Sequence, residues 1–373
     1  MRISPVVIVG AGIIGLAHAI TAREHGHDVV VFERDGRALG ASVRNFGTLW
    51  PIGCVPGAER AQALFGIERW AHLSEEAGFW MGRQGSLSLA YREEAWAVLQ
   101  EFRDGVDDCT LLDADAVLRR FPAANPRGLR GAIYSAAEAV VHPASTLAAL
   151  ADYARRRGIT IHFGTPVVKV HDEAVETSDG RRVPFQHLVI AAGDEMRLLF
   201  PEALAAAHVQ RCRLQMMRTV PQPAAFDMGA VFVSDLTLCH YPAFKDCPST
   251  PLLRARLERE LPHHCDWGVH VIAAQHDDRT LTLGDSHEYG LDFDPDSHEG
   301  VEQLILDALG DFVDLPDPRI ASRWHGVYLK STVGETQVVL HPRERVTMVT
   351  AMGGLGMTLS WGLAARTVEG WRS

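Results

Sequence analysis

The pattern of apolar and polar residues at the start of the chain predicts a strand, a helix and a second strand in close succession. Val6–Val9 is a short, wholly apolar run typical of a buried strand. Ile13–Glu24 has the pattern of a helix, and Gly26 stands where it would end. Asp28–Glu33 is apolar at its centre and predicts the second buried strand. This β-turn-α-β succession is the unit from which parallel dinucleotide-binding sheets are built.

The remainder of the chain mixes helical and strand patterns without an internal repeat. Helices are expected near Glu59–Gly78, Ala144–Arg157 and Val301–Gly310, and at the C-terminus over Met357–Gly370. Short strands are expected at Arg83–Ala90, Gly131–Val140, Thr165–Val170, Leu188–Ala192 and Arg345–Ala351. Leu214–Leu283 is interpreted as strands with irregular, Pro-rich connections such as Tyr241–Pro251. The mixture predicts an α/β fold.

Composition and charge exclude several classes of protein. The chain has 373 residues and a net charge of -11, and an acidic excess disfavours binding to a nucleic-acid backbone. No apolar run approaches the roughly 20 residues of a membrane span, and no signal peptide is recognised. Six scattered cysteines without a Cys-x-x-Cys pair favour a reduced, cytoplasmic protein. Cys239-His240, Cys247 and His263-His264-Cys265 match no zinc spacing, so no metal is expected.

The first predicted turn carries the glycine spacing of a dinucleotide site. Gly10 allows a tight turn, Gly12 lets a pyrophosphate approach the backbone, and Gly15 lets the helix pack closely on the sheet. The helix start at Ile13 and Ile14 would present free N–H groups to the phosphates. Glu33 ends the second strand, where a carboxylate accepts hydrogen bonds from an adenosine ribose. An acid there disfavours a 2′-phosphate, and hence NADP.

A second glycine turn lies near the other end of the chain. Gly353-Gly354-Leu355-Gly356-Met357-Thr358 again follows a predicted strand and opens a helix. Two such turns fit one long ligand that spans both, which favours FAD over NAD. The alternative is that these glycines only cap and pack a terminal helix.

These features together resemble the D-amino-acid oxidase, glycine oxidase and sarcosine oxidase family of FAD enzymes. The resemblance also includes Gly40–Gly47, His142-Pro143 before a helix, and Leu188–Gly193. It implies a Rossmann-type FAD-binding domain (residues 1–80, 138–205 and 323–373) interleaved with a mixed-sheet substrate domain (81–137 and 206–322). The cofactor-binding residues expected from the turns and the resemblance are Gly10, Gly12, Ile13, Ile14, Gly15, Glu33, Arg34, Ser42, Arg44, Asn45, Phe46, Gly47, Val168, Gly193, Gly353, Gly354, Leu355, Gly356, Met357 and Thr358.

Departures from the family pattern bear on the substrate. Relatives that oxidise amino acids carry an Arg that grips the substrate carboxylate, and Tyr328 stands at that position. Thr282 and Thr358 stand where sarcosine-oxidase-like relatives have lysines. Gly326 or a neighbour replaces the cysteine that binds the flavin covalently, so FAD is expected to be non-covalent.

The segment Arg44–Gly53 resembles a narrower group of glycine-oxidase-like flavoproteins associated with aminophosphonate breakdown. The implied substrate is 2-aminoethylphosphonate or its N-methyl form. A phosphonate needs several hydrogen-bond donors rather than one planar Arg fork. His287 and Tyr328 are the expected catalytic residues. The expected substrate-binding residues are Arg213, His270, Lys330 and Thr358, with Arg218 as a further candidate donor.

The implied reaction transfers a hydride from the amine carbon to flavin N5, and water then hydrolyses the imine to an aldehyde and an amine. The electron acceptor that reoxidises the flavin is O2 or another oxidant. Three alternatives stay open: a glycine, sarcosine or D-amino-acid oxidase, an enzyme of this fold that oxidises a hydroxy acid or sugar phosphate, and a flavin-binding protein without turnover. Gly284-Asp-Ser-His287 is no hydrolase elbow, because no Gly-x-Ser-x-Gly occurs.

Overall fold

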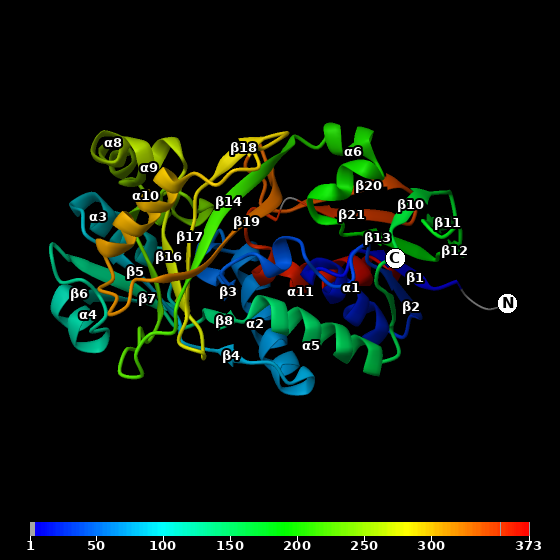
Figure 1. Cartoon of the computed structure of the whole chain (residues 1–373), viewed down its shortest axis with the longest axis horizontal. Helices are drawn as coiled ribbons and strands as arrows, with labels where there is room; N and C mark the ends of the chain where they lie inside the picture. Colours follow the sequence, from blue (N-terminus) through cyan, green and yellow to red (C-terminus); the bar gives the residue numbers. More distant parts are fainter. Residues whose placement is uncertain (1–3, 351, 373) are drawn as a thin grey trace.

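The computed structural model describes residues 4–350 and 352–372, and its first layer is a six-stranded sheet built around the N-terminal strand (Figure 1). β1, β2, β9, β13 and β21 are parallel, and β20 pairs antiparallel with β21 at one edge. Across the sheet the strands are β20 (Val338–Arg343), β21 (Val346–Thr350), β13 (His187–Ile190), β1 (Val6–Val9), β2 (Val29–Phe32) and β9 (Thr160–His162).

Both faces of this sheet are covered, because alternate residues of β1 enter two different apolar cores. Val6 and Ile8 pack in the larger core, and Val7 and Val9 pack in the smaller one. The first face carries four helices: α1 (Ile13–Glu24), α2 (Ala58–Ala77), α5 (Pro143–Arg156) and α11 (Gly356–Glu369). The other carries a small sheet of β10 (Val167–Val170), β11 (Ala174–Thr177) and β12 (Arg182–Pro184), with α6 (Pro201–Ala205).

A second, nine-stranded mixed sheet forms the other half of the molecule (Figure 1). Its longest strands, β14 and β19, pair antiparallel over their length and place Cys212 opposite Tyr328. The strand order is β18 (Glu288–Gly290), β14 (Val209–Thr219), β17 (Leu281–Gly284), β16 (Ile272–Gln275), β15 (Val231–Val233), β5 (Ser86–Ala90), β7 (Gly131–Ser135) and β6 (Cys109–Asp113), and β19 (Ile320–Ser331) pairs with β14. A small sheet of β3 (Thr48–Leu49), β8 (Ala139–Val141) and β4 (Met81–Gly82) contacts α11 through β3.

The interpretation of Leu214–Leu283 as strands and irregular connections was wrong in part. The segment also contains α7 (Asp235–Leu238), α8 (Thr250–Glu260) and α9 (Pro262–Asp266). Pro251 and Pro262 stand in the first turns of α8 and α9, where a missing N–H costs no hydrogen bond. In this segment the prolines were interpreted as signs of loops, but Pro251 and Pro262 stand at the beginnings of helices.

Helices α3 (Glu93–Asp104) and α4 (Ala114–Arg120) had no counterpart in the prediction, although α3 buries Ala95, Val98, Leu99 and Phe102 at helical spacing. The helix predicted at 301–310 is α10 (Glu299–Gly310). The last residue of the strand predicted over Arg345–Ala351 lies outside the described residues. The predicted domain boundary at residue 323 falls within β19, and the domain division stays a prediction. Within the part of the chain that the structure describes, no helix is both long and apolar enough to cross a membrane.

Candidate active site

The turn between β1 and α1 is compact because two of its glycines touch backbone directly. Gly10 has φ +103°, and a Cβ there would lie 2.4 Å from Ala191 O on the neighbouring strand. A Cβ on Gly15 would lie 1.9 Å from Gly10 O, so only glycine lets the helix pack at this distance. A Cβ on Gly12 would meet Ser42 Oγ at 2.9 Å. The geometry agrees with the close packing predicted for Gly10 and Gly15, and the approach of a pyrophosphate to Gly12 stays a prediction.

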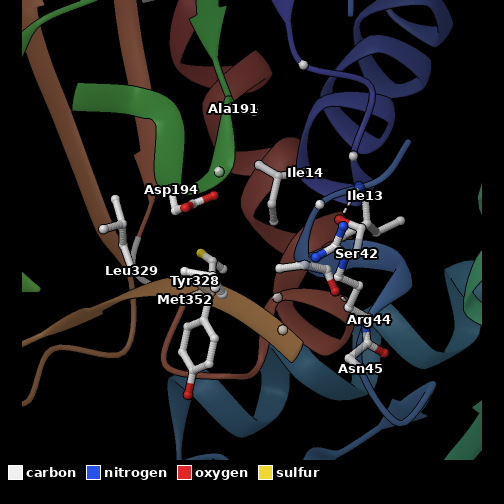
Figure 2. A pocket seen from close by; sticks show the side chains of 18 of the residues that line it. Ile13, Ile14, Ser42, Arg44, Asn45, Ala191, Asp194, Tyr328, Leu329 and Met352 are labelled. Atoms are coloured by element: carbon white, nitrogen blue, oxygen red, sulfur yellow. Dashed lines mark hydrogen bonds between the residues drawn. The ribbon is translucent and has the colours of Figure 1, made fainter. Parts of the chain in front are cut away.

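The N-terminus of α1 opens towards a long cavity and is not capped by a side chain of its own N-cap residue, Gly12. The Ile13 N–H donates to Ser42 Oγ at 3.0 Å, which holds the Ser42 loop against the helix (Figure 2). Glu33 accepts from the N–H of Ala11 at 2.7 Å and of Asp35 at 3.0 Å. A carboxylate has further lone pairs, so Glu33 can also accept ribose hydroxyls. The residues fit the adenosine diphosphate part of FAD.

The second glycine turn borders the same cavity from the C-terminal end of the chain. Gly353 has φ +56° and Gly354 φ +83°, values that favour glycine. They lead into α11, whose N-cap Leu355 also provides no capping side chain. Two helix N-termini therefore direct free N–H groups and partial positive charge at one elongated cavity. Such an arrangement suits the phosphates of a dinucleotide at one end and the electron-rich edge of a flavin at the other.

Most of the predicted cofactor-binding residues line this cavity, and five do not. Those in its wall are Gly10, Gly12, Ile13, Ile14, Glu33, Arg34, Ser42, Arg44, Asn45, Phe46, Gly193, Gly353, Gly354, Gly356 and Met357. Those outside the wall are Gly15, Gly47, Val168, Leu355 and Thr358. Gly15 and Gly47 pack against backbone carbonyls instead, and the wall near Val168 is made by Pro166 and Val167. The part of both groups in FAD binding remains a prediction.

The cavity continues between the two large sheets to a polar end that contains both predicted catalytic residues. Tyr328 projects from β19 across the cavity from the Ser42 loop (Figure 2). His287 follows β17, and His270 precedes β16. His240, Tyr241 and Asp285 also line this end, although the sequence analysis assigned them no role there. His240 was considered only with Cys239 as a zinc motif, because nothing in the linear sequence relates it to the other two histidines.

Burial determines the charge state of this polar end. Burial lowers the pKa of His240 and His270 well below the ordinary value, and the neighbouring imidazole of His287 lowers both further. Burial likewise lowers the pKa of His287 to about 3. Burial raises the pKa of Asp285 and of Tyr328 well above their ordinary values. The imidazoles are therefore neutral at physiological pH and can accept hydrogen bonds.

Three of the predicted substrate-binding residues lie outside the cavity wall. Arg213 is 4 % exposed and pairs with Glu288, its Nη2 2.5 Å from Oε2, while Lys330 donates from Nζ to Tyr289 Oη at 3.1 Å. Thr358 Oγ1 accepts from the N–H of Trp50 at 2.8 Å. Arg218 contacts Thr282 on the adjacent strand. Strand pairing in the nine-stranded sheet explains the ion pair of Arg213, because β14 places this residue directly opposite Glu288 of β18. The side chains of Arg213, Arg218, Lys330 and Thr358 are therefore not placed to contact a substrate in the cavity.

The fold and the cavity are those of an oxidoreductase that binds a dinucleotide, and known proteins similar to this chain belong to the same class. A family model described as DAO, FAD dependent oxidoreductase, matches residues 5–369. The glycine oxidase of Bacillus licheniformis is 24% identical over 351 residues, covering 90% of this chain and 84% of that protein. The crystal structure of glycine oxidase from Geobacillus kaustophilus superposes with a TM-score of 0.78 at 20% identity, covering 99% of this chain and 95% of that one.

A mitochondrial pyruvate dehydrogenase phosphatase regulatory subunit of Mus musculus is 28% identical over 199 residues. That match covers 50% of this chain but 23% of the mouse protein, so the chain spans less than a quarter of that relative. The family match extends over nearly the whole sequence. The chain belongs to the DAO family of FAD-dependent oxidoreductases, and its cofactor is FAD.

Proposed function

We propose that this enzyme oxidises a small amine that carries a phosphonate group, 2-aminoethylphosphonate or its N-methyl form, to phosphonoacetaldehyde. The observation that carries the proposal is Tyr328, which lines the substrate end of the cavity. The family resemblance implies that amino-acid-oxidising relatives have their carboxylate-binding Arg at this position. A planar carboxylate is held best by the two parallel N–H donors of an Arg fork. A wall without that fork favours a substrate of another shape.

The cationic side chains of the cavity wall bear on the proposed substrate only through the absence of an Arg clamp among the described residues of the substrate end. Among the described residues that line the cavity, the Lys and Arg side chains are Arg34 and Arg44, both from the nucleotide-binding loops. The substrate end offers imidazoles and phenol hydroxyls from several directions. A tetrahedral phosphonate has acceptor oxygens on three sides, which several separate donors satisfy better than one planar group.

Bound FAD supplies the two-electron acceptor, and the residues of the chain would position the amine. Burial at this end would favour the free amine over its ammonium form, and only the free amine gives up a hydride readily. The imidazoles of His287 and its neighbours would hold the amine at this end of the cavity. Tyr328 would orient the substrate through its hydroxyl, whose raised pKa keeps it a donor. FAD is proposed to bind without a covalent link, since no cysteine occurs among the described residues of the wall.

The proposal is tested by anaerobic reduction of the purified, FAD-loaded enzyme. Addition of 2-aminoethylphosphonate or its N-methyl form should bleach the oxidised flavin absorption, whereas glycerol phosphate and 2-hydroxyglutarate should leave it unchanged. Bleaching by the hydroxy compounds but by neither aminophosphonate would contradict the proposal. Admitting air to the reduced sample then shows whether O2 is an efficient acceptor.

A second candidate is oxidation of glycine, sarcosine or a D-amino acid. The similarity to a glycine oxidase over most of both chains favours it. Including glycine, sarcosine and D-alanine in the same reduction experiment separates the two, because the Tyr328 argument predicts slower bleaching by these carboxylates.

A further inference from the structure

Three histidines from separate segments form one cluster at the substrate end of the cavity. His240 follows α7, His270 precedes β16, and His287 follows β17. The ring centroids are 4.0 Å apart for His240 and His270, 4.3 Å for His240 and His287, and 5.0 Å for His270 and His287. One nitrogen from each ring lies within 4.8 Å of the other two. In a tetrahedral site with bonds of about 2.1 Å the ligand nitrogens lie about 3.4 Å apart, so the three side chains would have to rotate towards one another to complete the site.

The nitrogens of these rings are already oriented by the protein around them. His287 Nδ1 donates to Gly268 O at 3.1 Å, which leaves Nε2 with its lone pair free for a cation. His270 Nε2 lies 3.1 Å from Asp285 Oδ1 without the alignment of a hydrogen bond, and its Nδ1 lies 3.4 Å from Thr237 Oγ1. A backbone carbonyl on the far nitrogen, as at His287, is an arrangement that fixes the tautomer of metal-binding histidines.

Asp285 is a second observation that points to a missing cation. Its side chain is 4 % exposed, and within the described chain Oδ1 accepts no well-aligned hydrogen bond despite its closeness to His270. A buried carboxylate oxygen without a partner is costly, and a positive charge in the adjacent cluster would stabilise it. Lys330 is the nearby cationic side chain, but its Nζ is bonded to Tyr289 Oη and it lies outside the cavity wall.

We propose that His240, His270 and His287 bind a divalent transition-metal ion of the zinc class, with Asp285 as the carboxylate that balances its charge. Imidazole ligands select Zn2+, Co2+ or a similar ion over Mg2+ and Ca2+, which prefer oxygen. Three protein ligands leave one coordination position open, and the cluster faces the cavity. If the substrate is a phosphonate, as proposed above, one of its oxygens takes that position.

The test is a Co2+ titration of the FAD-loaded enzyme, made metal-free by chelation. Tetrahedral Co2+ should give absorption bands at longer wavelength than the oxidised flavin, saturating at one ion per chain and disappearing when Zn2+ is added. His240→Gln and His287→Gln should abolish the bands, and Asp285→Asn should weaken Co2+ binding about tenfold or more. Flavin absorption of each variant shows that it has folded and kept its cofactor.

His142 provides the matched control. It lies with Asp277 and Asp278 in another group whose ligand atoms lie close enough for a metal, but that group is largely exposed. His142→Gln should leave the bands unchanged. Absence of bands in the unmodified enzyme, or bands that survive His240→Gln and His287→Gln, would overturn the proposal. Flavin reduction by amines is a separate readout. The Co2+ bands therefore test the metal site even if the substrate proposal fails, and flavin reduction tests the substrate even if no Co2+ binds.

Discussion

At the scale of single residues, Tyr328 carries the proposed difference in substrate from amino-acid oxidases. It sits on β19 directly opposite Cys212 of β14, and its hydroxyl would lie 3.7 Å from a Cβ placed on Gly354 at the second glycine turn. The side chain thus reaches from the nine-stranded sheet to the loop that leads into α11. A residue at this point contacts whatever occupies the substrate end of the cavity.

Tyr328→Arg should shift preference from the aminophosphonate towards glycine and sarcosine. A new charge-assisted pair with the carboxylate contributes about 1.5–3 kcal/mol, so kcat/KM for the carboxylates should rise about tenfold or more relative to the phosphonate. Tyr328→Phe, which removes only the hydroxyl, is the control. Unchanged relative kcat/KM values in the Arg variant would argue against a substrate contact at this position.

At the scale of elements, α1 and α11 pack along each other, and each begins at the cavity. His18 lies in this contact and is completely buried. Its Nδ1 donates to Ile14 O at 2.7 Å, and its Nε2 lies 3.3 Å from Thr367 Oγ1 of α11. Burial lowers the pKa of His18 from 6.5 to about 4. The helix pair that presents both N-termini to FAD therefore contains a histidine that must stay neutral.

This histidine should make folding pH-dependent. The unfolded chain binds a proton below pH 6.5 while folded His18 does not until about pH 4, so stability is complete above pH 6.5 and falls as the pH drops through that window. At 1.36 kcal/mol per pH unit the loss is about 3 kcal/mol. Urea unfolding measures the free energy of unfolding at pH 7 and pH 5. Between these pH values it should decrease less for His18→Gln than for the unmodified protein. Equal decreases would show that His18 does not contribute.

At the scale of the whole molecule, one cavity joins parts that are distant in sequence. Its wall includes the first turn after β1, the loop at residues 38–46, the end of β13, a stretch of β19 and the start of α11. Residues of both large sheets line the cavity, so a bound FAD would contact both halves of the fold. Cofactor binding and global stability should accordingly be linked.

Removal of FAD should lower the unfolding temperature, and added FAD should restore it in a concentration-dependent way. At a free FAD concentration of 100 times Kd the expected stabilisation is about 2.7 kcal/mol. Thermal unfolding of deflavinated protein with increasing FAD measures this. FMN, which lacks the adenosine that Glu33 would bind, is the control and should stabilise less. A midpoint indifferent to FAD would contradict the linkage.

The sequence by itself determined the dinucleotide unit, because its signals are local. Gly10, Gly12 and Gly15 lie between the end of β1 and the first turn of α1, and Glu33 directly follows β2. Their spacing in the sequence alone therefore places them together. The bounds predicted for β1 and α1 were confirmed for the same reason.

Only the tertiary structure decided what the substrate end contains. His240, His270 and His287 meet because β16 and β17 pair antiparallel and α7 ends beside them, a relation that no sequence spacing records. Arg213 had the right chemistry for an anion, but strand pairing places it against Glu288 and outside the cavity. The local sequence sets the backbone that receives the cofactor, whereas long-range strand pairing selects the side chains that face the substrate.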